Sequence, residues 1–318
     1  MRAVHLVAGL VFVAVVPPLF AQTAECAAYS GDAGRVCAAA VDGTRAFHPV
    51  AGVLISGGNP TIGSAATLGG LGHFSFTVRA NAVQVVLPDL SYNGSSSTVP
   101  AGDKFFAPAP LVEGSLGLYK GMPTGLLAVD FLSSAQLLPT DQINNLTVDA
   151  GARQIAGIAL GLGYGARIGV LNGRGVLPAV SVSVMRRNIP RITYGDLAAG
   201  DRYSYGVDLQ ATNLRLIASK QLAVVDLAAG LGWDKYTGGA VIRFRDPLTG
   251  IPQPDVPVKL NNSRVMSFVD LGVSMSIVKL TGEVGYQGGK DQKLATNFQD
   301  FDTTKGKFFA GLGLRVGF

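Results

Sequence analysis

The chain has 318 residues, of which 48% are hydrophobic and only 15% are charged, and its formal net charge is +5. Ordinary globular domains carry about 25% charged residues, so this balance is unusual for a soluble protein. After the first 21 residues no uncharged apolar run of about 18 residues remains, which excludes further membrane helices. Low charge without a long apolar run is typical of a transmembrane barrel, because only every second strand residue faces lipid.

The N-terminus predicts export. A basic start precedes "LVAGLVFVAVVPPLF", which a double proline interrupts before "AQTA". This pattern is typical of a secretory signal peptide over residues 1–21, with cleavage after Ala21. Cleavage after Ala24 is the alternative, because Leu19 is large for its place before the first cut. An anchor helix is disfavoured, since the run is short and the prolines end it.

Residues 22–70 predict an N-terminal periplasmic or plug segment. Cys26 and Cys37 lie close together in an exported chain, which predicts a disulfide rather than a metal pair with His48. "GRVCAAAVDGTRAF" predicts a short helix that ends around "HPVAG". The following "ISGGNPTIGSAATLGG" predicts an irregular linker of small residues.

From Gly72 onward, apolar and polar residues alternate in about ten stretches, beginning with "GHFSFTVRANAVQVV". In "RYSYGVDLQ" the alternation sets Tyr203, Tyr205 and their neighbours on the apolar face and Asp208 on the polar face. One face of each strand should meet lipid and the other the lumen. The residues predicted to line the lumen are Arg79, Asp130, Arg167, Asp208, Arg215, Asp226, Asp270, Glu283 and Arg315.

The connections separate a barrel from a soluble β-sandwich, which also alternates. Short turns such as "KGMPTG", "NGRG" and "ASKQ" alternate along the chain with long polar loops. Short turns at one end, long loops at the other and an even strand number are the plan of a bacterial outer-membrane barrel. We therefore expect an all-β fold, a transmembrane antiparallel up-and-down barrel of about ten strands (10–12) over residues 71–318. The long loops are predicted at about 87–107, 136–153, 187–202, 236–263 and 288–306.

The last strand, "KFFAGLGLRVGF", has one apolar face and needs no protected edge if it pairs with the first strand. It resembles the C-terminal assembly signal of bacterial outer-membrane β-barrel proteins. That resemblance implies an outer-membrane location, outer-membrane lipid around the barrel and the barrel-assembly machinery as a partner. The residues that carry it are Phe308, Ala310, Leu312, Leu314, Val316 and Phe318.

A second, weaker resemblance concerns the front of the chain. The short N-terminal segment followed by "GGNP", with Asn59 and Pro60, is similar to FadL-type transporters of hydrophobic substrates. In those transporters such a segment plugs the barrel, although the barrel expected here is smaller.

The sequence does not predict a catalytic or cofactor-binding site. We expect no catalytic residue, no metal, no cofactor and no enzymatic activity. His73 and Ser75 share one strand face, but a polar residue at the barrel rim is favoured over an esterase pair. Runs such as "GLGYG" lack the strand-then-helix context of a phosphate loop. Asp300 and Asp302 are interpreted as a solvated loop rather than a calcium site.

The charges inside the barrel suggest a closed lumen, because opposite charges in a narrow barrel usually pair across it. We expect a plugged or narrow passive transporter or channel for small molecules, including hydrophobic ones. A structural or adhesive barrel that presents loops is the alternative, and an outer-membrane hydrolase is third. Arg186, Arg187 and Arg191 are predicted to meet lipopolysaccharide phosphates, and nucleic acid is not expected as a partner.

Overall fold

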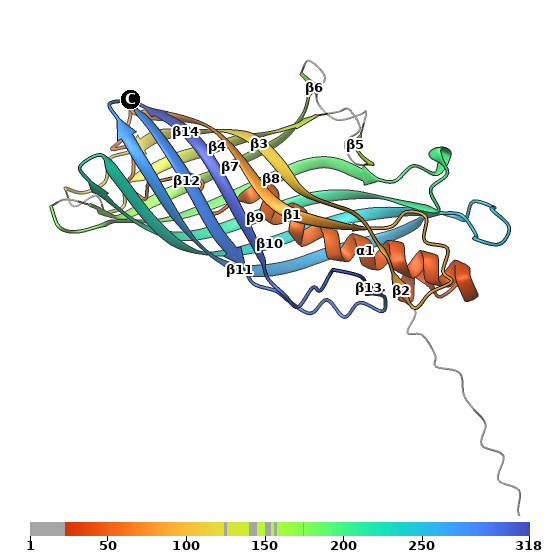
Figure 1. Ribbon diagram of the computed structural model, residues 1–318. Coiled ribbons are helices and arrows are strands. Elements are labelled where there is room, and N and C mark those ends of the chain that lie inside the picture. Colours follow the sequence, from red (N-terminus) through yellow and green to blue (C-terminus); the bar gives the residue numbers. More distant parts are fainter. Residues whose placement is uncertain (1–22, 124–125, 140–144, 150–153, 156–157, 174) are drawn as a thin grey trace, which may run out of the picture.

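Strands dominate the computed structural model, which describes residues 23–123, 126–139, 145–149, 154–155, 158–173 and 175–318. The expected signal peptide, residues 1–21, lies outside this part of the chain. Ten long antiparallel strands form a closed wall (Figure 1), since β1 pairs with β14 on one side and β7 pairs with β8 on the other. The predicted barrel of about ten strands is confirmed. The wall strands are β1 (Phe74–Pro88), β3 (Ala101–Tyr119), β4 (Val129–Pro139), β7 (Ile158–Asn172), β8 (Ala179–Tyr194), β9 (Tyr203–Leu222), β10 (Val225–Phe244), β11 (Val256–Met275), β12 (Val278–Gln287) and β14 (Lys307–Gly317).

The remaining elements are short strands and helices. The short strands are β2 (Thr98–Val99), β5 (Leu146–Val148), β6 (Gln154–Ile155) and β13 (Asn297–Phe298), and the helices are η1 (Ala24–Cys26), α1 (Gly31–Ser56) and η2 (Leu197–Ala199). Among the described residues, no helix combines the length and the apolar character needed to cross a membrane.

The outer surface of the wall is apolar. Leu231, Val265 and Leu312 each expose more than 60% of their surface, and similar side chains surround them. Exposing so many large apolar side chains would be unfavourable in water, whereas it matches the lipid-facing band of a membrane barrel. Aromatic rings lie within this surface, such as the pair Tyr286 and Phe308 with centroids 4.9 Å apart. The wall therefore spans a membrane.

Several connections predicted as long loops are largely strand. The segments expected as loops at 187–202 and 236–263 reduce to connections of about 195–202 and 245–255, because β8 runs to Tyr194, β10 runs to Phe244 and β11 already begins at Val256. At the end of the barrel where these connections lie, called here the long-loop end, the inward side chains are apolar. Tyr203, Tyr205, Tyr236, Ile242 and Phe244 are all buried there.

This inward apolar face contradicts the prediction that Asp208 lines the lumen. Because Tyr205 and Leu209 turn inward, Asp208 points out of the barrel and pairs with Arg191 (2.6 Å), with its side chain 45% exposed. Asp208 therefore does not line the lumen. Alternation placed Arg215 of β9 inward correctly, but near the long-loop end it assigned the polar face of β9 to the lumen, because a filled lumen can be as apolar as a bilayer.

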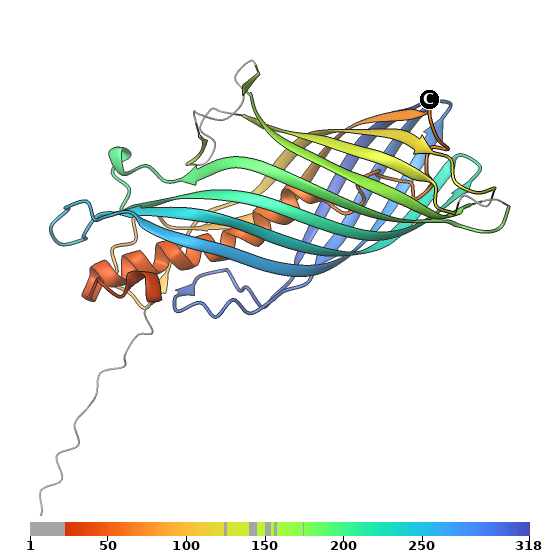
Figure 2. The same ribbon diagram turned by 180° about the vertical axis from the view of Figure 1, so that it is seen from behind.

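The lumen is filled by α1, which runs along the barrel and begins at the long-loop end, opposite the C-terminus (Figures 1 and 2). The expected helix was short and ended around "HPVAG"; the observed helix has 26 residues and contains Pro49 in its interior. A proline removes one helix hydrogen bond. Close packing against the wall on all sides holds the helix together here, since its residues from Val36 to Ser56 are nearly all buried.

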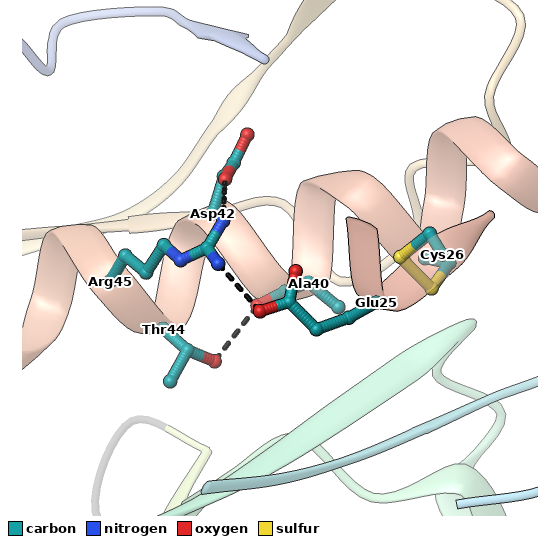
Figure 3. The surroundings of a disulfide bond; sticks show 7 residues. Glu25, Cys26, Ala40, Asp42, Thr44 and Arg45 are labelled. Carbon is teal, nitrogen blue, oxygen red and sulfur yellow. Dashed lines mark hydrogen bonds and ion pairs between the residues drawn. A yellow bond between two sulfur atoms is a disulfide. The ribbon is translucent and has the colours of Figure 1, made fainter. Parts of the chain in front are cut away.

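The first turns of α1 carry the disulfide (Figure 3). Cys26 in η1 and Cys37 in α1 are bonded, which confirms the predicted disulfide. Arg45 pairs with both Glu25 (2.7 Å) and Asp42 (3.2 Å), so η1 folds back along α1. The other carboxylate oxygen of Asp42 accepts hydrogen bonds from the backbone of the 288–306 connection, at Ala295 and Thr296. These contacts attach the start of α1 to the long-loop end.

Candidate functional site: the plugged lumen

The irregular stretch after α1, residues 57–68, occupies the lumen toward the short-turn end and is called the inner plug. It has no strand partner, yet most of it is buried. Buried backbone N–H and C=O groups need hydrogen-bond partners. Charged side chains of the barrel wall supply them, and these side chains form the candidate site.

Two carboxylates hold the start of the inner plug. Glu283 accepts hydrogen bonds from the backbone N–H groups of Gly58 (2.9 Å) and Asn59 (2.6 Å), one on each oxygen. Asp270 accepts one from the Asn59 side chain (2.7 Å) and one from the N–H of Gly63 (2.8 Å). The two carboxylates stand directly opposite each other on β11 and β12. Asn59 therefore links both acids to the plug.

Two arginines bind the carbonyl groups at the C-terminal end of α1. Arg79 donates to the carbonyls of Asn59 (2.6 Å) and Ser56 (3.3 Å), and Arg215 donates to those of Gly58 (2.7 Å) and Gly57 (3.0 Å). The last turn of α1 contains no basic residue of its own. Positive charge at a helix C-terminus is favourable, because it complements the helix dipole and the unpaired carbonyls. The wall thus caps the helix that it encloses.

The rest of the inner plug is held in the same way. Arg167 donates to the Thr61 hydroxyl (2.7 Å), Arg315 donates to the Thr61 carbonyl (3.3 Å), and Asp130 accepts from the N–H of Leu68 (3.2 Å). The charged wall residues that make these contacts come from β1, β4, β7, β9, β11, β12 and β14, and the uncharged Ser219 of β9 accepts from the N–H of Ala65 (2.8 Å). Residues 57–68 are therefore fixed mainly by polar side chains and not by strand pairing.

The wall charges also pair with one another. The ion pairs are Arg79–Glu113 (3.5 Å), Arg187–Glu113 (3.2 Å), Arg167–Asp130 (2.6 Å), Arg215–Asp234 (2.6 Å) and Lys279–Asp226 (2.9 Å). Burying a charge is costly unless it is paired and hydrogen-bonded. Most of these groups satisfy both conditions, so the network fixes the lumen in one arrangement.

The sequence placed most of this network on the lumen face but missed several members. The predicted residues that the structure places there are Arg79, Asp130, Arg167, Arg215, Asp226, Asp270, Glu283 and Arg315. Sequence reasoning missed Glu113, Arg187, Asp234 and Arg264, which are also buried. Glu113 falls in a stretch that was recognised as a strand, and its odd spacing from the outward-facing Leu116 and Leu118 was the available signal. Asp234 and Arg264 lie where strands run further than expected.

One predicted lipid-binding residue lies elsewhere. Arg187 was expected at the rim with lipopolysaccharide, but it is buried in the lumen and hydrogen-bonded to Asn213 and Glu113. Arg186 is exposed and donates to Gln210 (3.1 Å), and Arg191 reaches Asp208 on the outside. Neighbouring strand residues point to opposite faces, which separates Arg186 from Arg187. A register shift in β8 between Ile189 and Ile192 separates Arg191 from Arg187.

The remaining candidates take part in other contacts. His73 is exposed beside β1 and approaches the carbonyl of Gly70 (3.4 Å). In the loop, Asp300 lies 3.5 Å from Lys104 and Asp302 lies 3.9 Å from Lys305.

The residues of the C-terminal signal face outward. Phe308, Leu312, Leu314 and Phe318 are exposed, and Val316 pairs with Phe76 of β1. The Phe318 ring stacks on Phe74 (centroids 5.2 Å apart), and their backbones exchange two hydrogen bonds. The last strand thus closes the wall against the first.

Burial at the long-loop end affects one histidine of α1. Burial lowers the pKa of His48 from its ordinary value near 6.5 to about 4, against an opposing hydrogen bond with the backbone of Thr237. Its Nε2 atom is buried without a hydrogen-bond partner, and its ring meets Tyr236 edge-on. His48 is therefore a neutral packing residue at neutral pH.

No family model and no curated protein matches the chain. Solved structures that resemble it are outer-membrane β-barrels, in agreement with the expected class. The translocator domain of the autotransporter NalP from Neisseria meningitidis is 11% identical, with 88% of this chain and 99% of that chain covered and a TM-score of 0.44. The Pseudomonas putida toluene transporter TodX is 8% identical, with 77% and 88% covered and a TM-score of 0.27. The N-terminal β-barrel domain of Pseudomonas aeruginosa OprF is 12% identical, with 77% and 97% covered and a TM-score of 0.25. These likenesses are too distant to assign a family, and the barrel assignment rests on the strand pairing itself.

Proposed function

We propose that the protein is an outer-membrane barrel whose lumen is a passage for small solutes, closed at rest by the inner plug. The observation that supports this is the way residues 57–68 are held. Their partners are charged side chains, and such contacts can be exchanged for contacts with water or a solute. A plug held by strand pairing would have to break a ladder of backbone hydrogen bonds to move.

The chemistry of the site suggests which solutes suit it. Withdrawal of the inner plug would uncover acids such as Glu283 and Asp270 beside arginines such as Arg79 and Arg215. A passage with both signs of charge favours small polar or zwitterionic solutes over the hydrophobic ones of FadL-type transporters.

The cellular setting follows from the outside of the wall. The apolar belt and the outward face of β14 support insertion into the outer membrane after export by the predicted signal at residues 1–21. We also propose that Arg186, which is exposed, contacts lipid phosphate groups from outside the wall.

A reversible crosslink tests the proposal. A Cβ atom on Gly313 of β14 would lie 3.1 Å from Ile62 of the inner plug, so cysteines at both positions should form a disulfide. We expect the double variant Ile62→Cys, Gly313→Cys to show fewer channel openings in planar bilayers when oxidised, and openings near the wild-type frequency after reduction. The single variant Ile62→Cys and reduced wild-type protein are the controls, because reduction also opens Cys26–Cys37.

A structural barrel that presents loops and moves nothing is the second candidate. The apolar packing of α1 against residues such as Tyr205, Tyr236 and Phe244 favours it, because this half of the filling resembles a permanent core. Liposome swelling with intact protein separates the two candidates. If neither swelling nor channel opening occurs, with or without crosslink, the transport proposal is wrong and the structural barrel takes its place.

A further inference from the structure

A small cavity lies at the long-loop end between α1, β11, β14 and the 288–306 connection. Its volume is about 20 Å³, room for a single water molecule or one oxygen of a larger group. Ala46, Pro49 and Val50 of α1 form one side. The other sides carry polar groups, among them Arg264 and Gln292.

The polar groups that line this cavity include donors without acceptors. Arg264 is only 6% exposed, and its Nε has no hydrogen-bond partner. Its remaining hydrogen bonds are long ones to the carbonyls of Gly288 (3.4 Å) and Thr303 (3.5 Å). The side-chain Nε2 of Gln292, also a donor, is buried and unpaired. Buried donors without partners indicate a bound water or ion that accepts from both.

Charge favours an anion over water. Arg264 stands opposite Asp234 in the strand register, but the Asp234 carboxylate is taken by Arg215, Asn213 and Tyr236. Among the described residues no carboxylate lies within 4.0 Å of the Arg264 guanidinium or of the buried Arg315 of β14, whereas the buried arginines of β1, β7, β8 and β9 each have one. The positive charge of Arg264 is therefore left uncompensated by the protein.

Two lysines add to this charge. Lys305 and Lys307 line the same cavity, together with the single acid Asp302. The Asp302 carboxylate accepts from the backbone and hydroxyl of Thr304, and it lies 3.9 Å from Lys305. Three cations against one acid leave a net charge of +2 around the cavity.

A wider cavity of about 410 Å³ adjoins the first and shares Phe301, Asp302, Lys305 and Lys307 with it. Phe298 and Asp300 complete its lining. Lys307 lies over the Phe301 ring, 5.0 Å from its centre. The two cavities together suit a ligand with an anionic group at its inner end and a bulkier body outside.

We propose that this pair of cavities binds a phosphate monoester, with one phosphate oxygen on Arg264 and Gln292 and the others on Lys305 and Lys307. Guanidinium and ammonium donors match phosphate oxygens, and a monoester carries about −1.5 to −2 charges at neutral pH, close to the excess of +2 around the inner cavity. The acid Asp300 of the wider cavity is paired with Lys104, which lies outside both cavities (3.5 Å). Gln287 and Lys307, which line the inner cavity, are next along the strands to the lipid-facing pair Tyr286 and Phe308. The phosphate therefore comes from a lipid of the outer leaflet or from a soluble ester.

The experiment measures binding to folded, detergent-solubilised protein in two arms. One arm titrates inorganic phosphate, and the other uses nanodiscs that contain a phosphorylated lipid A or the same lipid after dephosphorylation. We expect Arg264→Gln to weaken binding at least about tenfold, as loss of a charge-assisted hydrogen bond does. Lys307→Gln should weaken it as well, and it serves if Arg264→Gln fails to fold. Lys290→Gln, an exposed lysine of the same connection that lines neither cavity, is the matched control.

Each outcome has a meaning. A loss in both arms supports the site for phosphate from either source, and a loss in the phosphate arm alone supports the site with a soluble source. A loss confined to the phosphorylated nanodiscs supports the site with a lipid phosphate as its ligand. Binding that is absent in both arms, or that falls equally in Lys290→Gln, overturns the proposal and leaves only nonspecific attraction by surface lysines.

Discussion

The ring of Tyr236 lies where a side chain on Gly52 would have to be. A Cβ atom on Gly52 would come within 2.5 Å of the ring, closer than such atoms approach in proteins. Tyr236 cannot easily move away, because its hydroxyl donates to Asp234 (2.8 Å) and accepts from Gln287 (2.8 Å). A residue of α1 and a residue of the wall therefore pack with complementary shapes.

Gly52→Ala should therefore destabilise the filled barrel by about 1–3 kcal/mol, the usual effect of adding a methyl group to a close-packed core. Thermal unfolding in detergent is the measurement. Gly282→Ala is the control, because nothing lies within 4 Å of a Cβ atom there. Equal stability of the two variants would show that α1 can shift freely inside the wall.

Phe318→Asp should block assembly into the outer membrane while leaving export intact. The change would remove the ring that stacks on Phe74 at the seam between β1 and β14, and it would place a charge on the lipid-facing side. A heat-modifiable, protease-resistant band in outer-membrane fractions is the readout. Leu248→Asp, in the 245–255 connection and 84% exposed, should assemble normally. A normal band from Phe318→Asp would contradict the assigned role of the last strand.

Leu231→Arg should destabilise the barrel by about 2–4 kcal/mol if Leu231 is near the bilayer midplane, and by less toward the rim. Leu231 is 63% exposed on the outside of the wall. Leu248→Arg in the loop is the matched change and should have little effect. The neighbouring Gly232 is a poor control, because a Cβ atom there would lie 2.7 Å from Arg215. Unfolding in lipid vesicles compares the variants, and equal effects would mean that Leu231 does not meet lipid.

Glu283→Gln should loosen the inner plug. The carboxylate accepts from two backbone N–H groups, at Gly58 and Asn59, whereas an amide offers only one acceptor oxygen. We expect more frequent channel openings in planar bilayers than for wild-type protein. Glu25→Gln, which alters only an ion pair with Arg45 far from the inner plug, is the control. Unchanged opening in Glu283→Gln would weaken the gating role of this contact.

Acid should destabilise the protein through His48. Because burial lowers the pKa of His48 in the folded state to about 4, the unfolded chain binds the proton first as the pH falls. This contribution is fully present above about pH 6.5 and is lost as the pH falls toward 4, by about 3 kcal/mol over the whole range. His48→Asn should flatten this part of the stability profile, measured by thermal unfolding between pH 8 and 4. A profile identical to that of the wild-type protein would contradict the assignment.

The sequence predicted the wall well because strand alternation and turn length are local properties. It could not predict which face of β9 points inward near the long-loop end, since that depends on what fills the lumen there. Tyr205 packs on α1 and Asp208 points outward because a helix of small residues occupies this half of the barrel. The length of α1 was missed for a related reason. Pro49 predicts a helix end in water, whereas the surrounding wall stabilises the helix past it.

The charged site was only partly predictable. Alternation placed Arg79 and Glu283 on the inner face, but it gave no sign that the plug backbone would be their main partner. Arg187 was misplaced because its segment looked like a loop. Strands that continue beyond the bilayer have polar outer faces, so hydropathy alone cannot distinguish them from connections.

The path of the N-terminal segment constrains the order in which this protein can fold. β1 starts at the short-turn end, beside Phe318, whereas η1 and the Cys26–Cys37 disulfide lie at the opposite mouth. A finished wall would have to admit a disulfide-closed hairpin at one end and pass it through a lumen already lined with paired charges. Joining of β1 to β14 is therefore expected to be a late event, completed around a helix that already crosses the future lumen. The N-terminal segment would then enter the lumen through the open seam between β1 and β14 before these two strands pair.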